Sequence, residues 1–178
     1  MVEPPGHTMR ISITGTPGVG KTVTAEKVST VLQVTHINIS KTAVTMGAVI
    51  KKDRDTSVVD VDILRKTLEK MDNIVIDSHF AEVFDVDFVF VLRCEPKILY
   101  KRLKERGYTE EKIKENVMAE ILDYCLIHAL DYHNPEKIFE VYTGEEIIAL
   151  VHNPVVKKSL AFGSRTHFLT EDNLALVE

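Results

Sequence analysis

The residues with the clearest chemical use form a glycine-rich run near the start of the chain. Residues 15–22 read GTPGVGKT, which matches the pattern G-x-x-x-x-G-K-S/T at every fixed position. Gly18 and Gly20 allow backbone conformations closed to other residues and leave backbone N–H groups room to meet phosphate oxygens. Lys21 brings a point charge to the β- and γ-phosphates, and Thr22 offers a hydroxyl to Mg²⁺. Because a turn that only joined two elements would not need the lysine, the run predicts a site for ATP or GTP.

A second group of polar side chains follows an apolar run later in the chain. Asp77, Ser78 and His79 come directly after the apolar residues 74–76. In an open parallel sheet, functional groups gather at the carboxyl ends of the strands, so Asp77 is expected beside the phosphate loop. There Asp77 can hold the Mg²⁺ shell, and His79 can position water or an acceptor phosphate. The alternatives are a carboxylate that caps a turn and a loop histidine with an ordinary partner.

Three arginines could supply further positive charge. Transfer of a γ-phosphoryl group needs cations around its equatorial oxygens. Arg93 follows an apolar run, and Arg102 and Arg106 are spaced to share one face of the next helix. A solvated charged face is favoured for Arg102, whereas Arg106 stands beside Gly107 and is favoured as a site residue.

These residues must be positioned by alternating strands and helices. The expected strands cover residues 10–14, 35–39, 73–77, 87–92 and 137–142, and the expected helices cover about 21–32, 62–71, 96–106, 109–129 and 145–152. Near-continuous apolar strands are typical of a parallel sheet covered on both faces. The sequence therefore predicts the α/β fold of a P-loop NTPase, with three α/β/α layers and a five-stranded parallel sheet.

Composition and length limit the class of protein. The 178 residues carry a net charge of −5, with 44% hydrophobic and 28% charged residues, as expected for one folded domain. The chain lacks the roughly 18 uncharged apolar residues that a membrane helix needs, and it lacks signal-peptide features, so we expect a cytoplasmic protein without membrane contact. Cys94 and Cys125 lack metal-type spacing and are expected to be buried thiols. Residues 1–8 are interpreted as a flexible leader, and residues 153–178 as a tail without assignment.

A P-loop alone does not name a reaction. A GTPase switch should carry D-x-x-G and N-K-x-D, but no Asp in this sequence has Gly three residues later and no Asn precedes Lys. The small phosphotransferases remain, in which one segment binds the phosphate acceptor and another closes over ATP. A small-metabolite kinase of the shikimate-kinase type shares the P-loop but leaves Asp77-Ser78-His79 unexplained.

The combination of motifs is more specific than the P-loop. The motifs are residues 15–22, Asp77-Ser78-His79, Val91-Leu92-Arg93 and the run RLKERGY at 102–108. Together they resemble the adenylate kinase isoenzyme 6 family, and its archaeal members most closely, over roughly residues 9–131. Ordinary adenylate kinases carry glycine-phenylalanine-proline-arginine where this chain has Ser78-His79-Phe80.

The resemblance implies an activity and a cellular role. It implies a broad-specificity nucleoside monophosphate kinase that converts ATP and AMP to two ADP with Mg²⁺, together with ATPase activity. It also implies a part in late maturation of the small ribosomal subunit, through transient contact with one of its ribosomal proteins. The alternative is an ATPase assembly factor that binds this ribosomal protein and whose kinase turnover is incidental.

The resemblance also implies site residues within a core over 9–152. The nucleotide contacts are Gly15, Gly18, Val19, Gly20, Lys21, Thr22, Val23 and Arg106. The catalytic residues are Lys21, Asp77, His79 and Arg106. The Mg²⁺ contacts are Thr22 and, through water, Asp77, and the acceptor contacts are Asn38 and Arg93. The acceptor-binding segment covers 38–56, and the lid covers 105–115.

The acceptor segment departs from the family pattern. Relatives carry an acidic residue and an arginine shortly after Asn38, where this chain reads SKTAVTM at 40–46. Lys51, Lys52 and Arg54 could bind the acceptor phosphate, or they could form a basic surface loop. The base preference at both nucleotide sites therefore stays open.

Overall fold

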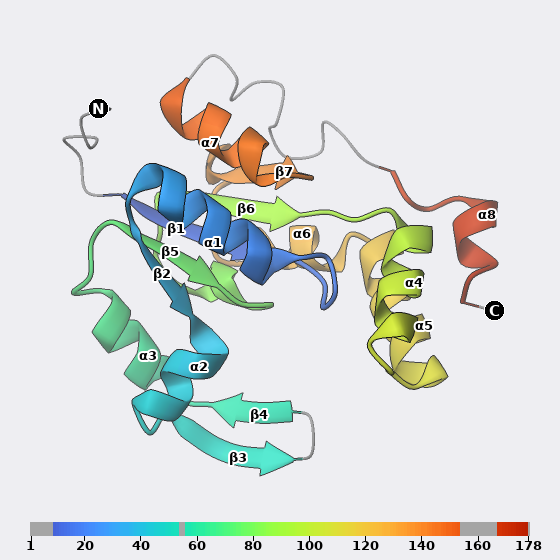
Figure 1. The fold of residues 1–178 in the computed structure, drawn as a ribbon, viewed down its shortest axis with the longest axis horizontal. Coiled ribbons are helices and arrows are strands. Elements are labelled where there is room, and N and C mark those ends of the chain that lie inside the picture. Colours follow the sequence, from blue (N-terminus) through green and yellow to red (C-terminus); the bar gives the residue numbers. More distant parts are fainter. Residues whose placement is uncertain (1–8, 54–55, 154–166, 178) are drawn as a thin grey trace.

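A parallel sheet forms the centre of the computed structural model, which describes residues 9–53, 56–153 and 167–177 (Figure 1). Its strands stand in the order β2-β5-β1-β6-β7, and each neighbouring pair runs parallel. The strands are β1 (Arg10–Thr14), β2 (Thr35–Asn38), β5 (Ile74–Asp77), β6 (Phe88–Leu92) and β7 (Ile138–Val141). The structure thus confirms the predicted five-stranded parallel sheet.

Side chains of the strands alternate between two hydrophobic cores, one on each face of the sheet. In β6, Phe90 and Leu92 belong to the first core, whereas Val89 and Val91 belong to the second. The helices of the first core are α1 (Lys21–Leu32), α4 (Pro96–Glu105), α5 (Glu110–Ile121) and α7 (Gly144–His152). Those of the second are α2 (Ile39–Thr45), α3 (Val61–Leu68) and α6 (Tyr124–Ala129). Helices on both faces produce the predicted three layers.

The prediction of one helix over 109–129 is wrong. α5 ends at Ile121 and α6 begins at Tyr124, with Asp123 between them in the left-handed conformation at φ 56°. α5 packs in the first core and α6 in the second, so the chain must turn between them. The four-residue spacing of apolar positions continues across the turn, from Ile121 to Cys125, and therefore hides it in the sequence.

The predicted acceptor segment contains structure that the sequence did not reveal. Ile39, expected as the end of a strand, begins helix α2 instead. An antiparallel hairpin of β3 (Val49–Asp53) and β4 (Thr56–Val59) follows and forms a second, two-stranded sheet. Figure 1 shows this hairpin projecting below the main sheet. Arg54, one of the predicted phosphate ligands, lies outside the described residues.

The end of the chain packs beside α5. Helix α8 (Glu171–Leu174) contacts α5, and Leu174, Leu176 and Val177 pack against the first core. The ring of Phe168 lies 5.2 Å from the guanidinium carbon of Arg93. The unassigned tail is therefore part of the fold from residue 167 to 177, whereas the predicted leader lies outside the described residues.

Short 3-10 turns at Ala81–Val83 and Pro135–Lys137 complete the connections. Among the described helices, none has the length and apolar character needed to cross a membrane.

Candidate active site

The glycine-rich loop connects β1 to α1, and two of its glycines meet close neighbours. A Cβ on Gly15 would lie 2.5 Å from the carbonyl oxygen of Leu92, and φ at Gly15 is 137°. A Cβ on Gly18 would lie 2.9 Å and 2.8 Å from side-chain carbons of Leu99 and Leu103, and φ there is 97°. Residues with a side chain would therefore strain both positions. The loop packs directly against α4, the helix that leads into the predicted lid.

Lys21 lies at the start of α1 and is folded onto the loop. Its Nζ donates hydrogen bonds to the carbonyl oxygens of Gly15 at 2.7 Å and Thr16 at 3.1 Å. Burial lowers the pKa of Lys21, and nearby groups, Cys125 and Asp77 among them, act in the opposite direction. Thr22 follows in the first turn of α1 and is half-buried, whereas Val23 is exposed.

Asp77 ends β5, and the sheet places it opposite Asn38 at the end of β2. Its carboxylate is buried and accepts a hydrogen bond from Asn38 Nδ2 at 2.8 Å. His36 Nε2 lies 3.5 Å from the same oxygen. His79 follows two residues later and keeps an exposed side chain, but partial loss of solvent around its ring and the charge of Lys21 lower its pKa. The charge of Lys21 therefore interacts with both Asp77 and His79.

Three buried glutamates escaped the sequence analysis: Glu82, Glu120 and, in β7, Glu140. Glu82 accepts hydrogen bonds from Thr14 Oγ1 at 2.5 Å and pairs with His128 Nδ1 at 2.8 Å. Glu120 on α5 accepts from Thr16 Oγ1 at 2.5 Å and from the backbone N–H of Cys94 at 3.1 Å. The burial of Glu120 could have been predicted, because this residue lies three positions after Val117 on the apolar stripe of α5.

Arg93 occupies the centre of a buried ion network. Its guanidinium donates to Glu120 Oε1 at 2.9 Å, to Glu140 Oε2 at 3.0 Å and to Asp123. Burial acts to lower the pKa of Arg93, but Glu120 and Asp123 outweigh it and raise the pKa overall. The guanidinium is thus engaged inside the protein, and an acceptor contact for Arg93 stays a prediction that these bonds do not support.

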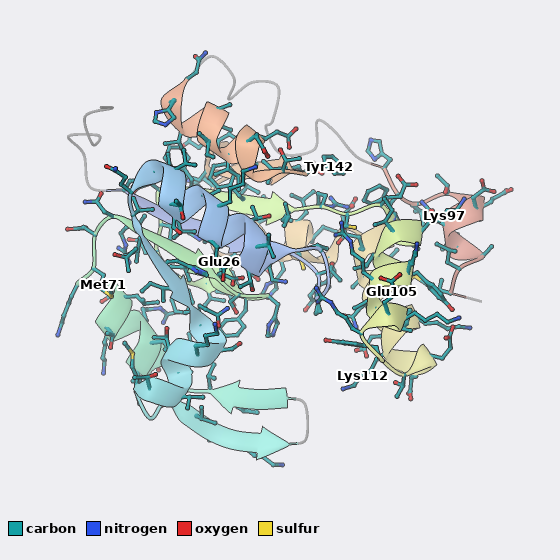
Figure 2. All side chains as sticks on the ribbon, viewed as in Figure 1. Glu26, Met71, Lys97, Glu105, Lys112 and Tyr142 are labelled. Carbon is teal, nitrogen blue, oxygen red and sulfur yellow. The ribbon has the colours of Figure 1, made fainter. Side chains whose placement is uncertain are left out.

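Two arginines lie at the end of α4, Arg102 in its last turn and Arg106 at its C-terminal cap. Arg102 Nη1 donates to the carbonyl oxygen of Val19 at 3.0 Å, so its end reaches the phosphate loop. Arg102 is exposed, as expected for a solvated charged face, and this bond adds a contact with the loop that the sequence analysis did not predict. Arg106 lies at the C-terminal cap of α4 and is exposed, and its predicted role over ATP stays a prediction. In Figure 2, Lys97, Glu105 and Lys112 mark the α4–α5 pair, which stands to one side of the sheet.

A cavity of about 700 Å³ opens beside the loop. Its walls come from Thr16 and Pro17 of the loop, from His79, and from α5, α6 and the residues that join and follow them. Burial raises the pKa of Cys125 in this wall to about 11, and burial also raises the pKa of Cys94. Both cysteines are free and buried, which confirms the prediction of buried thiols.

The oxygen ligands near the loop fit Mg²⁺. The described residues contain no cluster of three or more His, Cys, Asp or Glu side chains able to hold a metal. One hydroxyl at Thr22 and one carboxylate at Asp77 suit Mg²⁺, which keeps several waters and takes its remaining ligands from phosphates.

The fold and the loop together define a class of P-loop α/β proteins. A family model described as an AAA domain matches residues 11–123. Among solved structures, a shikimate kinase from Acinetobacter baumannii is similar with a TM-score of 0.55 at 13% identity, covering 82% of this chain and 93% of that chain. A deoxyadenosine kinase from M. mycoides is similar with a TM-score of 0.52 at 18% identity, covering 83% of this chain and 98% of that chain. At these identities the likeness shows the fold alone.

Sequence relatives identify the family. A protein from Pyrococcus furiosus named "putative adenylate kinase" is 43% identical over 152 residues, covering 82% of this chain and 83% of the relative. A protein of the same name from Natronomonas pharaonis is 42% identical over 137 residues, covering 77% and 82%. The chain belongs to this archaeal family, which confirms the resemblance to the adenylate kinase isoenzyme 6 family and its archaeal members.

Proposed function

We propose that the protein is a nucleoside monophosphate kinase that converts ATP and AMP to two ADP. The observation that carries the proposal is the phosphate loop between β1 and α1, with Lys21 at the start of α1, together with Asp77 and His79 at the carboxyl end of the neighbouring strand β5. The names of the archaeal relatives support the same reaction.

The donor nucleotide would lie on the phosphate loop. Backbone N–H groups of residues 18–20 and the N-terminus of α1 bind the phosphates, and Lys21 leaves the carbonyls of Gly15 and Thr16 to reach the β- and γ-phosphates. Thr22 and Asp77 would hold Mg²⁺, which neutralises charge on the phosphates when bound. Arg102 already touches the loop, and Arg106 is proposed to cover ATP from the lid at 105–115.

The acceptor would enter from the segment at 38–56. An oxygen of its phosphate forms a bond to the γ-phosphorus, while the bond from that phosphorus to the β-phosphate oxygen breaks and releases ADP. The acceptor phosphate is already ionised, so the chain's task is positioning and charge stabilisation. His79, with its lowered pKa, is neutral near pH 7 and orients the acceptor through hydrogen bonds.

The test is a steady-state screen of nucleoside monophosphates with ATP and Mg²⁺, with water as the baseline acceptor. ADP formation should depend on AMP or another monophosphate. In Lys21→Ala it should fall by about 10²- to 10³-fold, the typical loss when one transition-state donor is removed. ATP turnover that is indifferent to every monophosphate would refute the kinase proposal.

A specific observation favours a second candidate, an ATPase assembly factor. The residues that line the cavity beside the loop include His79, Glu115 and Asp131, but no lysine or arginine lies among these described lining residues. None of the described lining residues belongs to the acceptor segment at 38–56 either, so this cavity gives water access to the loop but offers a second phosphate no cation. The proposed partner is a small-subunit ribosomal protein, which the family resemblance suggests. A pull-down with small-subunit ribosomal proteins under ATP and under ADP tests it, and a set of partners insensitive to nucleotide would count against it.

A further inference from the structure

Asn38 uses both ends of its side-chain amide. It is the last residue of β2, and the parallel register places it directly opposite Asp77. Its Nδ2 donates to Asp77 Oδ2 at 2.8 Å, and its Oδ1 accepts from the backbone N–H of Lys41 at 3.1 Å. One half-buried side chain therefore touches the buried carboxylate and the first turn of the next helix.

The bond to Lys41 is the N-cap of α2. Asn38 has the extended backbone of a capping residue, at φ −84° and ψ 110°, and α2 runs from Ile39 to Thr45. This helix opens the segment proposed to bind the acceptor. The cap satisfies a backbone N–H that has no partner within the helix, and its loss lets the first turn fray.

The bond to Asp77 orients a carboxylate with little access to water. Asp77 is 3% exposed, so an oxygen without its donor is poorly compensated by solvent. His36 Nε2, at 3.5 Å, is the other side-chain contact described for this oxygen, and its distance is at the limit of a hydrogen bond. The amide of Asn38 is thus the principal donor that fixes Asp77 where it faces the phosphate loop.

The amide group is planar and rigid, so its two hydrogen bonds cannot change independently. A tilt of α2 that moves the Lys41 N–H rotates the amide and shifts its Nδ2 against Asp77. We propose that Asn38 is a positioning residue that couples the acceptor segment to the Asp77 carboxylate, rather than an acceptor ligand. The coupling rests on the proposed function for its biological meaning, because it would let acceptor binding adjust the residue that holds Mg²⁺.

A purely structural cap is the competing explanation, and substitution separates the two. Asn38→Ser keeps a good capping oxygen but shortens the side chain and removes the amide Nδ2 that donates to Asp77. Asn38→Ala removes both. Asp60 provides the matched control, because it caps α3 by accepting from the backbone N–H groups of Asp62 and Ile63.

The first experiment needs no nucleotide. Hydrogen exchange of the α2 amides is measured in a double-mutant cycle of Asn38→Ser and Asp77→Ala. Asp77→Ala should raise exchange in α2 by about 2- to 10-fold in the wild-type background, because it frees the amide, and should leave exchange unchanged in the Asn38→Ser background. Additive effects of the two substitutions would overturn the proposal. If Asp77→Ala does not fold, Asp77→Asn takes its place in the cycle, because it weakens the same hydrogen-bond acceptor.

The second experiment measures binding of β,γ-methylene-ATP with Mg²⁺, with and without AMP, by calorimetry. AMP should tighten binding to the wild type by about 5-fold or more and should have no effect in Asn38→Ser. Asn38→Ala should also raise α2 exchange by about 2- to 30-fold, whereas Asp60→Ala should keep the AMP effect. An AMP effect that survives in Asn38→Ser overturns the coupling. Wild-type protein that makes no ADP from ATP and AMP refutes the proposed function instead, and the nucleotide-free cycle still decides the coupling.

Discussion

Arg93→Ala should strongly destabilise the fold. The Arg93 side chain is 2% exposed, and those of Glu120 and Glu140 are 3% and 1% exposed. Removal of the guanidinium leaves these carboxylates buried without their cation, which typically costs about 3–5 kcal/mol. Domains unfold with about 5–15 kcal/mol in all, so this loss takes a large part of the total. At roughly 2–4 °C per kcal/mol for a chain of this size, Tm should fall by about 6–20 °C.

The assay is urea unfolding followed by circular dichroism, with thermal unfolding as a second measure. Arg93→Lys keeps the charge but has one nitrogen in place of three, so its free energy of unfolding should lie between those of the wild type and Arg93→Ala. Arg65→Ala is the matched control, because Arg65 pairs with Asp62 at 3.2 Å on the surface. Its cost should be about 0–1 kcal/mol.

The alternative role for Arg93, as an acceptor ligand, predicts a different pattern. In that case Arg93→Ala would raise KM for the monophosphate while the unfolding midpoint stayed within about 1 kcal/mol of wild type, as is typical for an exposed side chain. That result would refute the reasoning from the buried network.

Gly18→Ala should weaken nucleotide binding and lower the free energy of unfolding by about 1–2 kcal/mol or more, because φ is positive there and side chains of α4 occupy the space of the new methyl group. Calorimetry measures the binding and urea unfolding the stability. Gly47→Ala is the control, because φ is 66° but the space around it is open. His79 has a pKa below its ordinary value of 6.5, so the unfolded chain takes up this proton first as pH falls. Wild type should therefore lose stability below about pH 6.5 more steeply than His79→Gln, and equal slopes in urea midpoints would contradict the pKa shift. Cys125, with a pKa of about 11, should resist alkylation at pH 8 in the native protein and react in urea, as mass spectrometry will show.

The sequence predicted the sheet and the phosphate loop because their signals are local. Each strand is a short apolar run, and the loop is a fixed pattern between a strand and a helix. The turn at Asp123 was hidden because apolar residues keep a four-residue spacing on both sides, although α5 and α6 face different cores. The hairpin of β3 and β4 was not predicted, because Lys51 and Lys52 in β3 are typical of a basic surface loop rather than of a strand.

Site residues were harder to predict where their partners are distant in the sequence. Arg93 was interpreted as a phosphate ligand from its place after a strand, but Glu120, Asp123 and Glu140 engage it from α5, the turn that follows and β7. Arg102 is exposed as expected, but its contact with the carbonyl of Val19, 83 residues away, left no signal in the local sequence. Such pairings depend on how α4 and α5 pack, which a local pattern does not contain.

The division of the interior into two cores has a consequence for how the protein can vary. The helices around the predicted lid, α4 and α5, rest on one face of the sheet, and α2, which opens the predicted acceptor segment, rests on the other. The sheet therefore separates these two groups of helices, and substitutions that change the packing of one group need not disturb the packing of the other group. One link between the two sides lies at the strand ends, where Asn38 meets Asp77. A change of acceptor preference would thus need substitutions on one face of the sheet only.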